Sequence, residues 1–282
     1  FKLLGEKAII VILMAYDHLA LNTGVLSVQM HSPPIPFVAV HPRIPNNPLF
    51  YNASRTTPFE QFQCSAKRGF SAKSRITEAT PADLEFTTPL QIIEYPNPIL
   101  RAKNKRVGVF DDHLKRLVRE MFDVMYKTDG IGLSAPQVGI NIQLMVFNPA
   151  GEAGVGDEIV LVDPKVIKYS KKVLPFNEGC LSFPGIYADV ERPESVTIDA
   201  KDINGDRFEI NLSSLPARVF QHEFDHLQGI LFFDRMSEQV LDSIRPMLHA
   251  LEKKYEERSG LPSPEKIESR KRRTSAVGFG RS

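Results

Sequence analysis

The sequence has only two cysteines and no long apolar run. Cys64 and Cys180 cannot form the disulfide framework of a small secreted domain, so a reducing compartment is expected. The longest apolar stretch, residues 8–15, is far shorter than the ~20 residues of a membrane-spanning helix, and no membrane insertion is expected. With 282 residues and 42% hydrophobic content, the chain is long enough for one or two domains with a real core.

The chain as a whole also lacks a large net charge, but its charged residues are unevenly distributed. Residues 1–80 carry eight basic and four acidic side chains, and residues 253–282 carry nine and four. Because the whole chain has a net charge of +1, residues 81–252 must carry −8. Binding to nucleic acid needs basic charge on the folded surface itself, so this distribution excludes a DNA-binding domain.

The first 80 residues do not have the composition of a folded domain. Residues 33–48 contain six prolines, and no acidic residue lies between positions 17 and 60. Residues 54–75 are rich in Ser, Thr, Arg and Lys, with Glu60 as the only acid. This composition is typical of an organellar transit peptide, and we predict one over residues 1–80. The alternative is a disordered leader that carries no targeting signal.

Residues 81–259 are expected to form the folded body, followed by a basic, disordered tail over 260–282. The apolar periodicity predicts helices over residues 111–127, 214–228 and 237–257, and strands over 142–147, 159–162 and 195–200. Asn204-Gly205 predicts a hairpin after the last of these strands. The order of a helix, several strands and two helices favours an α+β fold with mainly antiparallel sheet.

Local signals bound the predicted helices. Asp111 offers an N-cap to the first helix, and Gly130 supplies a terminating position after it. Ser213 or Ser214 caps the second helix. Pro246 is expected to kink or restart the third helix, because proline lacks the N–H that a helix interior needs.

The second helix carries the sharpest chemical signal, His222-Glu223-Phe224-Asp225-His226. Positions i and i+4 lie on one face of a helix, so two imidazoles can bind one metal ion while Glu223 reaches a water molecule beside it. The alternative is an amphipathic helix whose histidines pair with Asp225 or Glu223. The features that predict this helix, its caps and its apolar face, are compatible with both interpretations.

The third ligand distinguishes the possible metal sites. One large class of metalloprotease has a His six residues after the second His of the motif, where this chain has Phe232. Another class uses a downstream Glu, for which Glu238 and Glu252 are candidates. Upstream, Glu178-Gly-Cys-Leu-Ser182 offers Cys180, and a thiolate with two imidazoles leaves one position open for water, as in catalytic sites.

A third segment, Gly130-Ile-Gly-Leu-Ser-Ala-Pro-Gln137, has two glycines and two small residues that permit close approach of another chain. Together the three segments resemble the motifs of the peptide deformylases: G-φ-G-φ-A-A-P-Q, where φ is apolar, then E-G-C-L-S and Q-H-E-φ-D-H-L-x-G. The single departure is Ser134 at the first alanine, a small change that is expected to leave activity intact. The resemblance covers about residues 89–255, and the tail after Glu252 is similar to the plant organellar branch.

The resemblance implies a fold, a reaction and a set of roles. Antiparallel sheets would pack around a central metal-binding helix, with a further C-terminal helix. The reaction would remove the formyl group from the N-terminal formyl-methionine of nascent polypeptides and release formate. Cys180, His222 and His226 would bind the metal, and Glu223 would be the general acid–base. Gln137 and the Leu181 backbone N–H would stabilise the oxyanion.

By the same resemblance, Ile131 and Gly132 would pair with the substrate backbone like an added strand. Leu181, Val219 and His222 would line the methionine pocket, and Glu178 is expected to pair with Arg192. The expected cofactor is Fe²⁺, although Zn, Ni or Co suits the same ligands. The expected location is the chloroplast stroma, and the mitochondrial matrix is a possible second location by the same resemblance.

Two other functions are left open. A metallopeptidase that cuts internal peptide bonds would need a His or Glu as third ligand. A non-catalytic, ribosome-associated factor would keep the scaffold without the metal. The basic run 270–273 permits a transient ribosome contact through the tail, and a solvated tail is its alternative interpretation.

Overall fold

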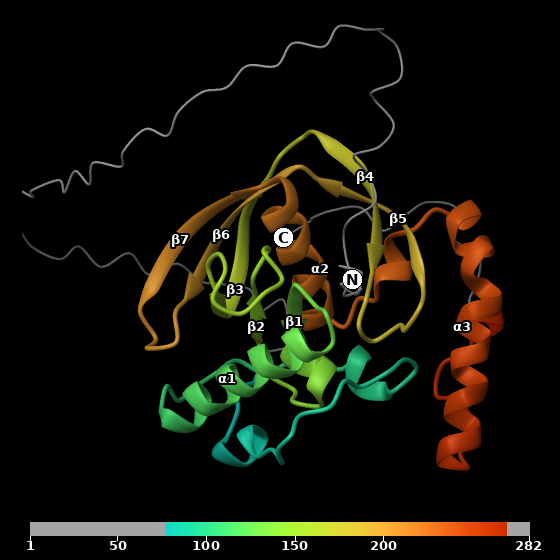
Figure 1. The fold of residues 1–282 in the computed structure, drawn as a ribbon, viewed down its shortest axis with the longest axis horizontal. Helices are drawn as coiled ribbons and strands as arrows, with labels where there is room; N and C mark the ends of the chain where they lie inside the picture. Colours follow the sequence, from blue (N-terminus) through green and yellow to red (C-terminus); the bar gives the residue numbers. More distant parts are fainter. Residues whose placement is uncertain (1–76, 270–282) are drawn as a thin grey trace, which may run out of the picture. The chain divides into compact units, whose positions relative to one another are not determined.

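The computed structural model describes residues 77–269, so most of the predicted leader and the basic run 270–273 lie outside the described residues (Figure 1). Within that range there are three α-helices: α1 (Asp112–Lys127), α2 (Ser214–Leu227) and α3 (Glu238–Ser259). The strands are β1 (Gly132–Ser134), β2 (Leu144–Phe147), β3 (Ile159–Tyr169), β4 (Val173–Gly179), β5 (Tyr187–Pro193), β6 (Ser195–Lys201) and β7 (Arg207–Ser213). None of the described helices is long and apolar enough to cross a membrane.

The strands form two antiparallel sheets, which confirms the predicted α+β class. One sheet has the order β1-β2-β3-β6-β7, and the other consists of β4 and β5. Helix α2 packs against the larger sheet and also contacts β5, so it lies between the two sheets (Figure 1). The buried face of β6, with Val196, Ile198 and Ala200, contributes to the same core as Phe220 of α2. The sheets therefore hold α2 at the centre of the described fold.

Helix α1 forms where the sequence predicts it, but its end differs from the expectation. The Asp111 side chain accepts a hydrogen bond from the Leu114 N–H at 3.0 Å, as an N-cap does. At the other end the left-handed residue is Asp129, with φ 55°, and not Gly130. The Gly130 N–H instead bonds to the Met125 carbonyl at 2.8 Å, which closes the last turn.

Helix α3 runs through Pro246 as one element, so of the two predicted effects, a kink or a restart, the restart does not occur. Its buried side chains lie on both sides of the proline: Leu241, Ile244, Leu248 and Leu251. Burying one such side chain stabilises by roughly 1.5–3 kcal/mol, whereas an interior proline costs about 3 kcal/mol. Packing of the apolar face on both sides therefore outweighs the lost hydrogen bond.

The chain continues to pack against the body beyond residue 259, the predicted start of the tail. Ile267 is buried in the same cluster as α3, and its N–H donates to Glu252 Oε1 at 2.7 Å. Arg101 forms an ion pair with Glu265 at 2.6 Å. The ordered body thus includes the first residues after Gly260, because their polar and apolar groups have partners on α3 and on the segment before α1.

Candidate active site

Helix α2 places the two histidines and the glutamate of the motif in the interior. His222, Glu223 and His226 are all buried, and the two imidazole rings have their centroids 5.2 Å apart. The helix ends at Leu227 and is followed by Gly229 with φ 69°. A Cβ at Gly229 would lie 2.7 Å from the Arg101 carbonyl oxygen, so only glycine lets the chain turn there.

Cys180 reaches the two histidines from the end of β4. Its Sγ lies 3.2 Å from His226 Nε2, and the ligand atoms of Cys180, His222 and His226 all lie within 4.8 Å of one another. The alternative third ligands lie elsewhere. Glu238 pairs with Arg245, and Glu252 accepts hydrogen bonds from Tyr95 and Ile267. The sulfur ligand considered from the sequence is therefore the one that the fold brings to the histidines.

Behind the histidines lies a buried carboxylate, Glu178. Its Oε2 is 3.0 Å from His222 Nδ1, which leaves His222 Nε2 to face the ligand cluster. The expected partner Arg192 donates two hydrogen bonds to Glu178, at 2.7 and 3.0 Å. Burial by itself would raise the pKa of Glu178, but Arg192 and His222 hold that pKa well below its usual range. The carboxylate therefore stays charged next to the ligand cluster.

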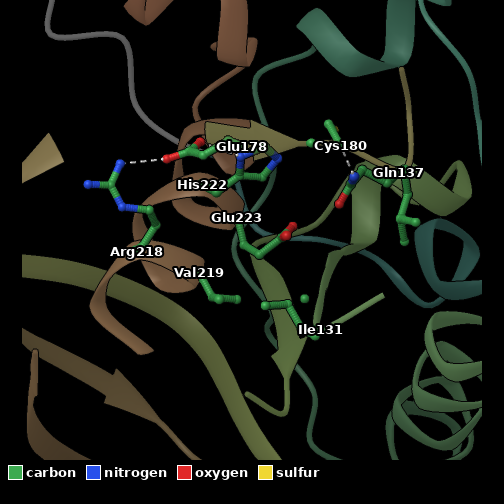
Figure 2. A pocket seen from close by; sticks show the side chains of 11 residues that line it. Ile131, Gln137, Glu178, Cys180, Arg218, Val219, His222 and Glu223 are labelled. Atoms are coloured by element: carbon green, nitrogen blue, oxygen red, sulfur yellow. Dashed lines mark hydrogen bonds and ion pairs between the residues drawn. The ribbon is translucent and has the colours of Figure 1, made fainter. Parts of the chain in front are cut away.

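Two further charged residues belong to this network, and the sequence analysis missed both. Arg218 donates to Glu178 at 2.9 Å (Figure 2), and Asp225 accepts from Arg192 at 2.7 Å. Both lie on α2 and share the buried side of the helix with His222. A charged residue four positions before His222, on the buried face of an amphipathic helix, was the signal that could have revealed Arg218.

Strand β1 lies very close to α2, and this proximity depends on Gly132. A Cβ at Gly132 would lie 2.6 Å from Val219 Cγ1 and 2.7 Å from Glu223 Oε1. Ile131 and Val219 form one side of the resulting pocket, and Gln137 and Cys180 form the opposite side. Glu223 lies between the two sides (Figure 2). Leu181 lines the same cavity. The sequence analysis predicted no strand over β1.

Gln137 follows β1 in a short 3₁₀ turn, and Ser134 orients its side chain. The Ser134 N–H and hydroxyl each donate to Gln137 Oε1 at 2.8 Å. With its oxygen engaged, the amide presents Nε2 to the pocket, 3.6 Å from Cys180 Sγ. The residue that departs from the family motif therefore contacts the catalytic candidate Gln137 directly.

The electrostatics of the site favour a bound cation and a proton acceptor. Burial raises the pKa of Glu223 to about 7, and its Oε2 has no hydrogen-bond partner. Burial lowers the pKa of His226 well below its usual range, so this imidazole is neutral, as a ligand must be. Burial opposes the charged form of His222 as well, but Cys180 and Glu178 raise its pKa well above the usual range. The same negative groups attract a metal cation.

These features define the class of protein. A thiol and two imidazoles on a buried face suit zinc, iron, cobalt or nickel, and the adjoining Glu223 is placed to handle a proton. A cysteine–histidine–histidine site in an α+β fold, with a cleft beside an edge strand, is that of a metal-dependent hydrolase.

Comparisons with known proteins agree. The sequence model of one family, described as polypeptide deformylase, matches residues 89–241. The chain is 65% identical to a tomato protein named peptide deformylase 1B, chloroplastic, over 84% of this chain and 85% of that one. It is 66% identical to an Arabidopsis thaliana protein named peptide deformylase 1B, chloroplastic/mitochondrial, over 81% and 83%. A plant peptide deformylase crystal structure, 74% identical, superposes with a TM-score of 0.64 over 64% of this chain and 99% of that one.

The chain belongs to the peptide deformylase family, within its plant chloroplastic and mitochondrial branch. The predicted reaction and organellar localisation are thereby confirmed. The protein is a hydrolase that removes the formyl group from the N-terminal methionine of newly made polypeptides. Activity requires a metal, for which Cys180, His222 and His226 are the candidate ligands.

Proposed function

We propose that Cys180, His222 and His226 hold the metal and that Glu223 is the general acid–base. The observation that carries this assignment is the buried, unpartnered carboxylate oxygen of Glu223, one residue from a metal ligand and in the same cavity as Gln137. Leaving such an oxygen unsatisfied costs about 1–3 kcal/mol, so a hydrogen-bond donor is expected there during catalysis.

Held by these three residues, a metal ion would supply positive charge to the site and would lower the pKa of water toward neutrality. Glu223 accepts the proton that the attacking water loses and later delivers it to the leaving amine. A pKa of about 7 suits both transfers, because the same carboxyl must gain and lose a proton near neutral pH.

Gln137 and Leu181 stabilise the negative charge that develops on the formyl oxygen. Gln137 Nε2 faces the pocket because Ser134 holds Oε1, and Leu181 follows Cys180 in the loop after β4. One such donor is typically worth ~3 kcal/mol of barrier.

The substrate peptide pairs with Ile131 and Gly132. Among the described strands β1 pairs only with β2, so it is an edge strand of the five-stranded sheet, the position to which a peptide adds as a further strand. Val219 and Leu181 supply apolar surface for the methionine side chain.

The physiological ion in this proposal is Fe²⁺, which the ligand set suits as well as zinc, nickel or cobalt. Residues 1–80 act as the transit peptide, and residues 81–259 form the catalytic domain. The segment that follows residue 259 packs against this domain. The basic run 270–273 makes a transient contact with ribosomal RNA, since adjacent cations suit phosphate groups.

The test is formate release from a formyl-methionine tripeptide by the anaerobic, iron-loaded protein and its Glu223→Gln variant. We expect release by the parent and a loss of ~10² or more in kcat for the variant. A folded, metal-loaded parent that releases no formate would contradict the proposal. A Cys180→Ala variant that keeps its metal and cuts internal peptide bonds would favour the metallopeptidase instead.

A further inference from the structure

A second group of potential metal ligands lies on α3, outside the active site. His249 and Glu252 stand three positions apart on the helix, and Glu268 approaches them from the segment after it. His249 Nδ1 is 3.0 Å from Glu268 Oε1 and 3.5 Å from Glu252 Oε2. All three ligand atoms lie within 4.8 Å of one another.

Glu252 is the buried member of the group, and one of its carboxylate oxygens is available to bind an ion. Its side chain is only 3% exposed. Oε1 accepts two hydrogen bonds, from the Tyr95 hydroxyl at 2.8 Å and from the Ile267 N–H at 2.7 Å. Oε2 is buried and accepts no hydrogen bond from the described residues, although His249 Nδ1 lies 3.5 Å away. The two donors on Oε1 fix the carboxylate so that Oε2 is directed to His249 and Glu268, and a buried carboxylate oxygen in that position needs a cation.

The spacing of the donor atoms suits a small divalent ion. Zinc binds imidazole nitrogen and carboxylate oxygen at about 2.0–2.2 Å, so neighbouring donors in a tetrahedral site lie roughly 3.3 Å apart. The separations of 3.0 and 3.5 Å from His249 Nδ1 lie on either side of that value. His249 and Glu268 are exposed on their outer side, which gives an ion a route in and leaves room for water.

We propose that His249, Glu252 and Glu268 form a second site, for a zinc-class divalent ion, with a structural role. The ion joins the segment after Gly260 to α3, replacing the repulsion between two carboxylates by a shared cation. Through Glu252 it also supports Tyr95, whose N–H donates to the Ser182 carbonyl at 2.9 Å, two residues after Cys180.

Equilibrium dialysis of the full chain against Zn²⁺ alone, followed by metal analysis, tests this assignment. We expect His249→Ala and Glu268→Gln each to bind one equivalent less than the parent. Glu257→Gln is the matched control: it removes an exposed carboxylate from the same helix and should bind as much as the parent. Because His249 and Glu268 lie outside the pocket, formate release should stay within about two-fold of the parent in all three variants.

Thermal unfolding gives a second measurement. Added Zn²⁺ should raise the Tm of the parent and of Glu257→Gln more than that of His249→Ala or Glu268→Gln, since an ion that binds only the folded state stabilises it. Equal zinc content in parent and variants would overturn the proposal. So would a parent whose Tm does not respond to zinc.

Discussion

Replacing Ser134 by alanine tests how the oxyanion donor is oriented. Ser134 is fully buried, and its hydroxyl supplies one of the two hydrogen bonds to Gln137 Oε1, each 2.8 Å long. Alanine stands at this position in the family motif and is smaller than serine, so the variant should fold. The remaining N–H bond still positions Gln137, but the amide gains freedom to rotate away from the pocket.

The expected size of the effect follows from these contacts. One neutral hydrogen bond has a net worth of about 1 kcal/mol, which corresponds to roughly a five-fold loss in kcat. The loss cannot exceed that of removing the donor itself, about 10²–10³ for Gln137→Ala. Because Ser134 contacts Gln137 and Glu223 and not the peptide, KM should be unchanged.

The assay is a double-mutant cycle with steady-state formate release from a formyl-methionine tripeptide. Parent, Ser134→Ala, Gln137→Ala and the double variant are compared, each loaded with the same metal. If the serine positions the glutamine, Ser134→Ala has no further effect once Gln137 is removed. An equal loss in both backgrounds, or a rise in KM at constant kcat, would refute the reasoning.

Three other outcomes are expected. Gly132→Ala should lower kcat/KM at least ten-fold, because its Cβ would overlap Val219 and Glu223, whereas Gly108→Ala, with its nearest neighbour at 3.5 Å, should be tolerated in the same assay. Arg192→Ala should cost about 3–5 kcal/mol in urea unfolding, since it leaves the buried carboxylates of Glu178 and Asp225 without this partner; a cost under 1 kcal/mol would argue against it. The folded-state pKa of Glu178 is depressed, so its stabilisation is present above pH ~4.5 and is lost as pH falls below that value; the Tm of the parent should fall more steeply between pH 5 and 3 than that of Glu178→Gln.

Much of the fold was predictable because its signals are local. The apolar spacing and the Asp111 cap specify α1, and the hairpin between β6 and β7 forms around Asn204 and Gly205 as expected. Its loop, residues 202–206, is longer than two residues, because the Asp202 carboxylate accepts the N–H groups of Asn204 and Asp206. The end of α1 at Asp129 and the course of α3 through Pro246 depended on packing that local rules do not contain.

The strands that shape the site were harder to predict. β1 has three residues, which is too short for an alternation of apolar and polar side chains to be recognised. β4 contains Pro175, which argues against a strand in a sequence-based prediction, and among the described strands it pairs with β5 alone. Their stability comes from contacts with α2 and with their partner strands, β2 for β1 and β5 for β4. The same is true of Arg218 and Asp225, whose role appears only once Glu178 and Arg192 lie beside the helix.

The sequence by itself determined the ligand pair on α2, because four residues make about one helical turn and bring His222 and His226 to one face wherever the helix lies. It also pointed to Cys180, Gln137 and Glu223 through motifs similar to those of a known family. Tertiary structure alone decided that Cys180, 46 positions before His226, lies within 3.2 Å of it, that Ser134 orients Gln137, and that Glu223 is buried enough to raise its pKa to about 7. Each of these depends on β1, β4 and α2 meeting in one core, and such contacts between distant segments have no local signature in the chain.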